Sequence, residues 1–220
     1  MVPFVNFTAR IDGHPSDALS TKYEVRGFPT LMIIDASGNK AATPQGRDLE
    51  SFSKAIDNLN DLDDLRERSA GGEIGLEAGI LLAELNLGSI ELKPAVKRRN
   101  GLALPKKLET SARSEWKATV LEIDALLFNL TVAEMFQNAG RDEDKQAELG
   151  KKLYRMAKDG QFATGDMTYG YWSKVMEMAK SKKDRKVFEK GYNALYAMYK
   201  DNPRAEQLLA EMKAELDAMK

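Results

Sequence analysis

Cysteine is absent from this chain of 220 residues, which also contains one histidine and two tryptophans. Without cysteine the chain can form no disulfide, supply no thiol nucleophile and offer no thiolate to a metal. The single histidine, His14, lies near Asp12 and Asp17, yet a metal site needs three or four converging ligands. A polar cluster at a turn accounts for these residues, so we expect no metal and no cofactor.

The chain also lacks an excess of either charge and any long apolar run. Its 33 lysines and arginines nearly match its 34 aspartates and glutamates, which leaves a net charge of −1. Nucleic-acid binding needs a basic surface, so we expect no nucleic-acid partner. The most apolar window, residues 74–87, contains Glu77 and Glu84 and is shorter than the roughly 18 residues of a membrane span, so we expect no such span.

The first residues have neither the basic start nor the apolar core of a signal peptide. Because the chain can begin inside a longer protein, its compartment stays open between cytoplasm and periplasm. The sequence leaves the oligomeric state equally open.

Two charged clusters interrupt the balanced background. The basic residues Lys97-Arg98-Arg99 and Lys106-Lys107 lie in a loop-rich stretch and form either a solvated linker or a contact for an acidic partner. The acidic run from Asp57 to Glu67 lacks the glycine and ligand spacing of a calcium loop, so we interpret it as a solvated helix face. Asn129-Leu130-Thr131 matches the N-glycosylation pattern, and we expect this match inside a helix to be accidental.

The first 66 residues mix strand and helix signals. β-Branched and aromatic runs predict strands, a continuous apolar run predicts a strand buried on both faces, and Asp48 opens an amphipathic helix. The predicted order is β-α-β-β-α, with a strand at 4–12, a helix at 16–23, the buried strand at 30–35, a turn at 36–39, a weak strand at 40–43, and a helix whose inner face carries Leu49, Phe52, Ile56 and Leu59.

Helical periodicity dominates from about residue 73 onward. The glycine-containing break Ser69-Ala70-Gly71-Gly72 predicts a boundary between two domains, 1–68 and 73–220. Apolar stripes predict helices around residues 74–87, 116–130, 149–156, 169–179, 188–198 and 205–219, with an irregular stretch containing Pro94, Gly101 and Pro105 between the first two.

The segment Lys22-Tyr23-Glu24-Val25-Arg26-Gly27-Phe28-Pro29-Thr30, followed by an apolar run and Asp35-Ala36-Ser37-Gly38, carries a family resemblance. Together with the flanking elements it resembles the C-terminal half of a thioredoxin domain, over residues 1–66. The resemblance implies a cis Phe28–Pro29 bond and a substrate-binding loop formed by Phe28, Pro29 and Thr30. The half that would contain the Cys-x-x-Cys motif is absent, so the resemblance implies no redox activity for this chain.

The absent half should also contain a strand lying between those at 4–12 and 30–35. Unpaired strand edges are costly when buried, at about 1–3 kcal/mol for each unsatisfied group, and they invite association. Three explanations stay open. The chain is truncated, the strands pair with each other in a smaller sheet, or a second chain supplies the missing strand.

The helical half resembles a degenerate tetratricopeptide-like helix pair between Trp172 and Pro203, with small residues Ala179 and Gly191 where the helices would pack closely. An ordinary helical bundle is the alternative. Tyr192, Tyr196 and Tyr199 share a second helix face, which either lines a peptide-binding surface or packs against a neighbouring helix.

The expected fold class is therefore α/β plus all-α: a partial thioredoxin-like β-α-β-β-α unit followed by a helical bundle or repeat-like domain. The expected function is that of a thioredoxin-like fragment related to thiol–disulfide oxidoreductases and inactive by itself. The alternative is a non-catalytic module that binds a protein or peptide through its helical half.

Overall fold

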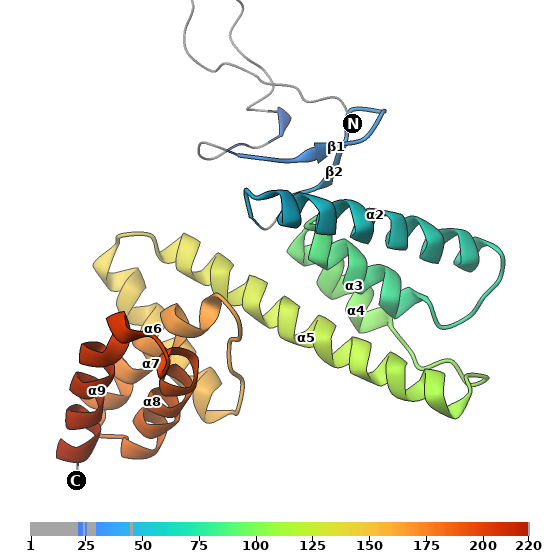
Figure 1. Ribbon diagram of the computed structural model, residues 1–220. Helices are drawn as coiled ribbons and strands as arrows, with labels where there is room; N and C mark the ends of the chain where they lie inside the picture. The colour runs from blue at the N-terminus through green and yellow to red at the C-terminus, as the bar shows by residue number, and fades with distance from the viewer. Residues whose placement is uncertain (1–21, 24, 26–29, 45, 220) are drawn as a thin grey trace, which may run out of the picture. The chain divides into compact units, whose positions relative to one another are not determined.

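The computed structural model describes residues 22–23, 25, 30–44 and 46–219 (Figure 1). This part of the chain is mostly helical and has one small sheet, which agrees with the expected combination of an α/β segment and a helical region. The predicted strand at 4–12, nearly all of the predicted helix at 16–23 and the predicted cis Phe28–Pro29 bond lie outside the described residues. The missing strand was predicted between those at 4–12 and 30–35. Because the first of these is not described, the missing strand stays a prediction.

Two compact units meet within a long helix, one ending at Trp116 and the other starting at Lys117. The described residues of the first unit form β1 (Ile33–Ile34), β2 (Lys40–Ala42), α2 (Leu49–Ala70), α3 (Glu77–Leu87) and α4 (Leu92–Gly101). Helix α5 (Thr110–Ala139) begins in the first unit and continues into the second, which further contains α6 (Glu143–Lys158), α7 (Met167–Ser181), α8 (Arg185–Tyr199), the 3-10 turn η1 (Pro203–Ala205) and α9 (Glu206–Ala218).

β1 and β2 form an antiparallel hairpin, and its turn lies where the sequence predicted one. The Asp35 carboxylate accepts hydrogen bonds of 2.9 Å from the backbone N–H groups of Ser37 and Asn39. The bond from Asn39 is the main cause that holds the pKa of Asp35 below its ordinary value. Gly38 has a φ of +78°, which a residue with a side chain adopts only with strain. The Tyr23 hydroxyl donates to the Gly38 carbonyl over 2.9 Å.

The apolar run at residues 30–35 forms a shorter and more exposed strand than predicted. Among the described residues, β1 pairs with β2 alone. Ile33 packs against the small core formed by Ala42, Ala55, Leu62 and Leu87, whereas Ile34 is 41% exposed. Successive side chains of a strand point to opposite faces, so only one face of β1 contacts this core. The prediction of burial on both faces is therefore wrong.

Helix α2 begins as predicted because Asp48 caps it. The Asp48 carboxylate accepts a hydrogen bond of 2.8 Å from the Ser51 N–H, which satisfies one of the free donors at the helix start. Leu49 was predicted on the buried face but is 83% exposed, since the buried stripe starts more than a turn later at Ala55. The Thr43 N–H donates to the Leu87 carbonyl over 3.0 Å and joins the end of β2 to the end of α3.

The stretch after α3 is helical, although the sequence predicted irregular structure there. Helix α3 ends at Gly88, which has a φ of +60°, as predicted. Pro94 occupies the third position of α4, where a missing N–H costs no intrahelical hydrogen bond. Because residues 92–101 are helical, Lys97-Arg98-Arg99 lie on a helix rather than in a loop.

The glycine-containing seam is the turn between α2 and α3. Gly71 caps α2, and Gly72 has a φ of +93°. Helices α2 and α3 then pack against each other across this turn. The domains expected from the sequence, 1–68 and 73–220, stay a prediction.

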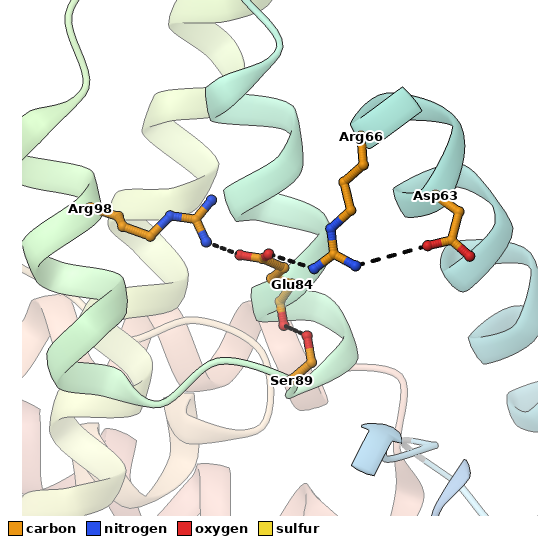
Figure 2. A network of polar contacts seen from close by, with 5 residues as sticks. All are labelled: Asp63, Arg66, Glu84, Ser89 and Arg98. Carbon is orange, nitrogen blue, oxygen red and sulfur yellow. Dashed lines mark hydrogen bonds and ion pairs between the residues drawn. The ribbon is translucent and has the colours of Figure 1, made fainter. Parts of the chain in front are cut away.

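A buried carboxylate joins α2, α3 and α4 (Figure 2). Glu84 on α3 is 8% exposed, and its oxygens accept hydrogen bonds from Arg66 on α2, over 2.9 Å, and from Arg98 on α4. The Glu84 carbonyl also accepts from the Ser89 hydroxyl over 3.2 Å, just beyond the end of α3. Burying one carboxylate is tolerable here because two guanidiniums from two other helices compensate its charge.

The helices of the second unit pack successively, α6 on α7, α7 on α8 and α8 on α9. Gly191 is essential to the α7–α8 contact, because a Cβ atom there would lie 2.5 Å from the Met176 Cγ and 2.9 Å from the Trp172 Cε3. Ala179 is fully buried. The predicted close approach is thus confirmed at Gly191, while the repeat-like character of these helices stays a prediction.

Replacing Glu84 by glutamine should weaken the first unit, since Arg66 and Arg98 lose their shared carboxylate. Both arginine side chains are about half-exposed, so we expect the loss in unfolding free energy to be only about 1–2 kcal/mol. Urea denaturation followed by circular dichroism measures it. The matched control Glu67→Gln removes an exposed carboxylate of α2 and should change the free energy by less than about 0.5 kcal/mol. Equal losses in the two variants would contradict the role of Glu84.

Candidate functional site

A row of four tyrosines lies on α7 and α8 and is the candidate binding site; we call it the tyrosine surface. Tyr192 and Tyr196 have ring centroids 5.8 Å apart, and Tyr199 meets Tyr169 edge to face at 6.1 Å. Tyr196 and Tyr199 are three residues apart on one helix, which makes the row continuous. Tyr169 comes from α7, so the row bridges two helices.

The helical register explains why this surface is only half-buried. On α8, Phe188, Gly191 and Leu195 face the core. The three tyrosines of α8 follow at the edge of that face, with spacings of four and three residues. Tyr192 and Tyr199 pack against the core, while Tyr196 is 47% and Tyr169 is 43% exposed. Packing against the core therefore accounts for Tyr192 and Tyr199, while the peptide-binding role of this face stays a prediction.

The tyrosine hydroxyls are available to a ligand. Within the described part of the chain, no hydrogen bond involves the hydroxyl of Tyr169, Tyr192, Tyr196 or Tyr199. Tyr171, by contrast, is fully buried and donates to the Gln161 carbonyl over 2.6 Å, and burial raises its pKa. Tyrosines whose hydroxyls lack partners can donate to a bound polypeptide.

A second aromatic group was not predicted. Phe162 is 40% exposed and stacks on the buried Trp172 with ring centroids 5.3 Å apart. The Nζ of Lys190 lies 5.7 Å from the Phe162 centroid, in cation–π geometry. Phe162 precedes α7 and belongs to no periodic apolar stripe, so no sequence pattern indicated its role.

The loop expected to bind substrate is described only at Thr30, which is exposed and precedes β1. Phe28 and Pro29 lie outside the described residues, so the substrate-binding role of all three residues stays a prediction. In the ranges that the structure describes, no three histidine, aspartate or glutamate side chains are placed to hold a metal ion. No helix there is long and apolar enough to cross a membrane.

Two polar side chains join loops to helices in the second unit. Asn129 on α5 donates to the Thr164 hydroxyl over 3.1 Å and accepts from the Thr164 N–H over 3.0 Å. The Asn129 amide thus forms two hydrogen bonds within the unit, and the accidental nature of the glycosylation match stays a prediction. Asp184 caps α8 by accepting from the Val187 N–H over 3.2 Å.

Asp184 also accepts a hydrogen bond of 2.6 Å from the Tyr154 hydroxyl of α6. This bond is the main cause that lowers the pKa of Asp184, and the Val187 N–H lowers it further. Burial, together with Asp184, raises the pKa of Tyr154 to about 12. The ammonium groups of Lys158 and Lys182 lie 5.7 and 5.8 Å from the Tyr154 ring centroid. The hydrogen bond between Tyr154 and Asp184 thus joins α6 to the turn between α7 and α8.

Comparison with known proteins gives one informative similarity. A protein named protein disulfide isomerase-like 2-1, from Oryza sativa subsp. japonica, is 34% identical over 109 residues, which is 49% of this chain and 26% of that protein. The chain thus spans about a quarter of the length of this relative. No family model and no solved structure matches the chain. The similarity supports a distant thioredoxin-like relationship for part of the chain.

Replacing Tyr154 by phenylalanine should cost about 0.5–1.5 kcal/mol of unfolding free energy at neutral pH, because Asp184 loses its hydroxyl donor. The folded pKa of Asp184 lies below the ordinary 3.8, so this stabilisation is present above pH 3.8 and is lost as the pH falls below it. The deficit of the variant should accordingly shrink on acidification. Urea titrations at pH 7 and at pH 3 measure it.

Tyr196→Phe is the control for this substitution, since it removes a hydroxyl that has no partner in the described residues. It should leave the unfolding free energy unchanged within about 0.5 kcal/mol at both pH values. A Tyr154→Phe deficit that is the same at pH 7 and pH 3 would show that Asp184 is not involved.

Proposed function

We propose that this chain is the thiol-free part of a thioredoxin-related thiol–disulfide oxidoreductase. The similarity to a protein disulfide isomerase-like protein is the observation that carries this proposal. The Lys22–Thr30 segment and the hairpin that follows it support the same relationship. Disulfide exchange requires attack by a thiolate, and the chain contains no cysteine. Its own role is therefore to bind and position a substrate, with the redox cysteines in another segment of the same protein.

In this arrangement Phe28, Pro29 and Thr30 form the substrate-facing loop. Thr30 lies three residues before β1, and the Asp35 turn follows the end of that strand. A proline adopts the cis form at a cost of only about 0.5–1 kcal/mol, so a cis Phe28–Pro29 bond is accessible to this loop. An extended substrate chain would then lie along the loop, presented to cysteines upstream.

A second candidate function is polypeptide binding by the helical unit. The tyrosine surface favours it, because two rings are exposed and four hydroxyls lack partners in the described chain. Tyrosine provides a large, rigid contact area at a small entropic cost, and interface hot spots are enriched in it. The close α7–α8 packing at Gly191 keeps the rings on a rigid support. The two functions are compatible in one protein, since a redox enzyme must hold its substrate chain.

The isolated chain should not accelerate insulin reduction by dithiothreitol above the uncatalysed rate, because it has no thiol to exchange. Turbidity of precipitating insulin chains measures this, with a thioredoxin as positive control. Sequencing the coding region that precedes Met1 tests the other half of the proposal. We expect an in-frame Cys-x-x-Cys followed by a helix, and a stop codon directly upstream would overturn the proposal.

Tyr196→Ala should weaken binding of an unfolded polypeptide by about fivefold or more, because it removes the most exposed ring of the tyrosine surface. Fluorescence anisotropy with labelled, reduced and carboxymethylated α-lactalbumin measures the dissociation constant. The control Leu121→Ala removes another exposed apolar side chain of the same unit, 70% exposed on α5, and should leave binding unchanged. Equal effects of both variants, or no binding by the native chain, would rule out the tyrosine surface.

A further inference from the structure

Helix α4 has a buried face and a basic face. Ala95 is fully buried and marks the inner side. Lys93, Lys97 and Asn100 follow the spacing i, i+4, i+7 on the opposite side, and all three are exposed. Val96 lies beside the two lysines and is 37% exposed. The outer face of α4 therefore combines two ammonium groups with a small apolar side chain.

The basic side chains of this region differ in whether they form contacts within the unit. Arg98 points toward Glu84, as Figure 2 shows, and Arg99 is half-buried. Since α3 and α2 hold Glu84 and Arg66, the Arg98 contact fixes how α4 is rotated on the unit. Lys93, Lys97, Lys106 and Lys107 are exposed, and none of them forms an ion pair with any residue that the structure describes.

The positive charge is local to this region. Residues 92–107 contain six lysines and arginines and no acidic residue, which gives them a charge of +6. The whole chain carries −1, so the remaining residues carry −7. A positive patch on an otherwise acidic protein selects negatively charged partners by its local potential rather than by net charge.

We propose that Lys93 and Lys97 form a docking surface for an acidic polypeptide segment, with Val96 contacting an aliphatic side chain of that segment and with Lys106 and Lys107 adding to the local positive charge. The surface lies in the first unit and is independent of the tyrosine surface and of the proposed redox relationship. Glutamate and aspartate pair with the ammonium groups, and the fixed orientation of α4 spaces Lys93 and Lys97 one helical turn apart.

The same residues fit other anions less well. Single-stranded nucleic acids bind aromatic side chains on which their bases stack, and residues 92–107 contain no aromatic residue. A helix bound to a membrane surface buries a face of large apolar residues, whereas the outer face of α4 presents only Val96. The observations thus favour a polypeptide with carboxylates and aliphatic side chains.

Fluorescence anisotropy tests the docking surface, using the full chain and a labelled twelve-residue peptide of repeating Glu-Glu-Leu. We expect saturable binding in about 50 mM salt. The double variant Lys93→Glu/Lys97→Glu should weaken it about tenfold, since each exposed pair contributes a factor of about 1.5–5 and reversal adds repulsion. The control Lys151→Glu/Lys152→Glu changes the net charge equally, on two exposed lysines of α6, and should retain binding.

Three results would overturn the proposal. The first is no binding of the peptide at all, and the second is an equal loss of binding in both double variants, which would indicate attraction to net charge alone. A twelve-nucleotide oligouridine that binds more tightly than the peptide and depends on Lys93 and Lys97 would identify a nucleic-acid surface instead. Val96→Ser provides a second arm, because it should weaken the Glu-Glu-Leu peptide but leave a peptide of repeating Glu-Glu-Ser unaffected.

Discussion

The pairing of the Glu84 carboxylate with Arg66 and Arg98 is the interaction on which the packing of α2, α3 and α4 depends. The carboxylate is buried on α3, and burying a charge is costly unless partners compensate it. Arg66 and Arg98 provide that compensation from the helices on either side of α3 in the sequence. Each guanidinium stays half-exposed, so the arginines keep part of their hydration while Glu84 gives up most of its own. One side chain thereby sets the rotation of two helices.

This arrangement has a consequence for the surface. Because Arg98 is held against Glu84, the opposite side of α4 is free to present Lys93 and Lys97. Arg98, which stabilises the packing of α4, and Lys97, which is exposed to solvent, therefore belong to the same basic run. In the second unit, polar side chains similarly fix the loops: Asn129 holds Thr164, and Tyr154 holds Asp184 at the start of α8. With its helices held in this way, the unit can keep the rings of Tyr196 and Tyr169 at its surface.

The chain lacks cysteine, yet part of it is similar to a protein disulfide isomerase-like protein. The two observations are compatible if another segment of the same protein carries the redox cysteines, as proposed above. An oxidoreductase must both exchange thiols and hold an unfolded or extended chain. In the function proposed above, a chain without cysteine serves the second task. The two proposed surfaces, one aromatic and one basic, would provide two chemically distinct ways to hold a polypeptide.

The sequence by itself determined the local features, because their causes are local. Asp48 starts α2, the Asp35–Asn39 turn joins β1 to β2, and Gly88 ends α3, each through a cap or a backbone conformation set within a few residues. Periodicity likewise identified the helices of the second unit. The close packing at Gly191 was predictable because a small residue interrupts an apolar stripe.

The tertiary structure alone decided which side chains meet across distant segments. The pairing of Glu84 with Arg66 and Arg98 joins residues 18 and 14 positions apart, and no local pattern specifies it. Helix α4 was missed because Pro94 suggests a break, although its place in the first turn permits a helix. The exposure of Ile34 and Leu49 likewise depends on where the core ends. An apolar side chain is buried only where other segments pack against it, and its own sequence position does not specify those segments.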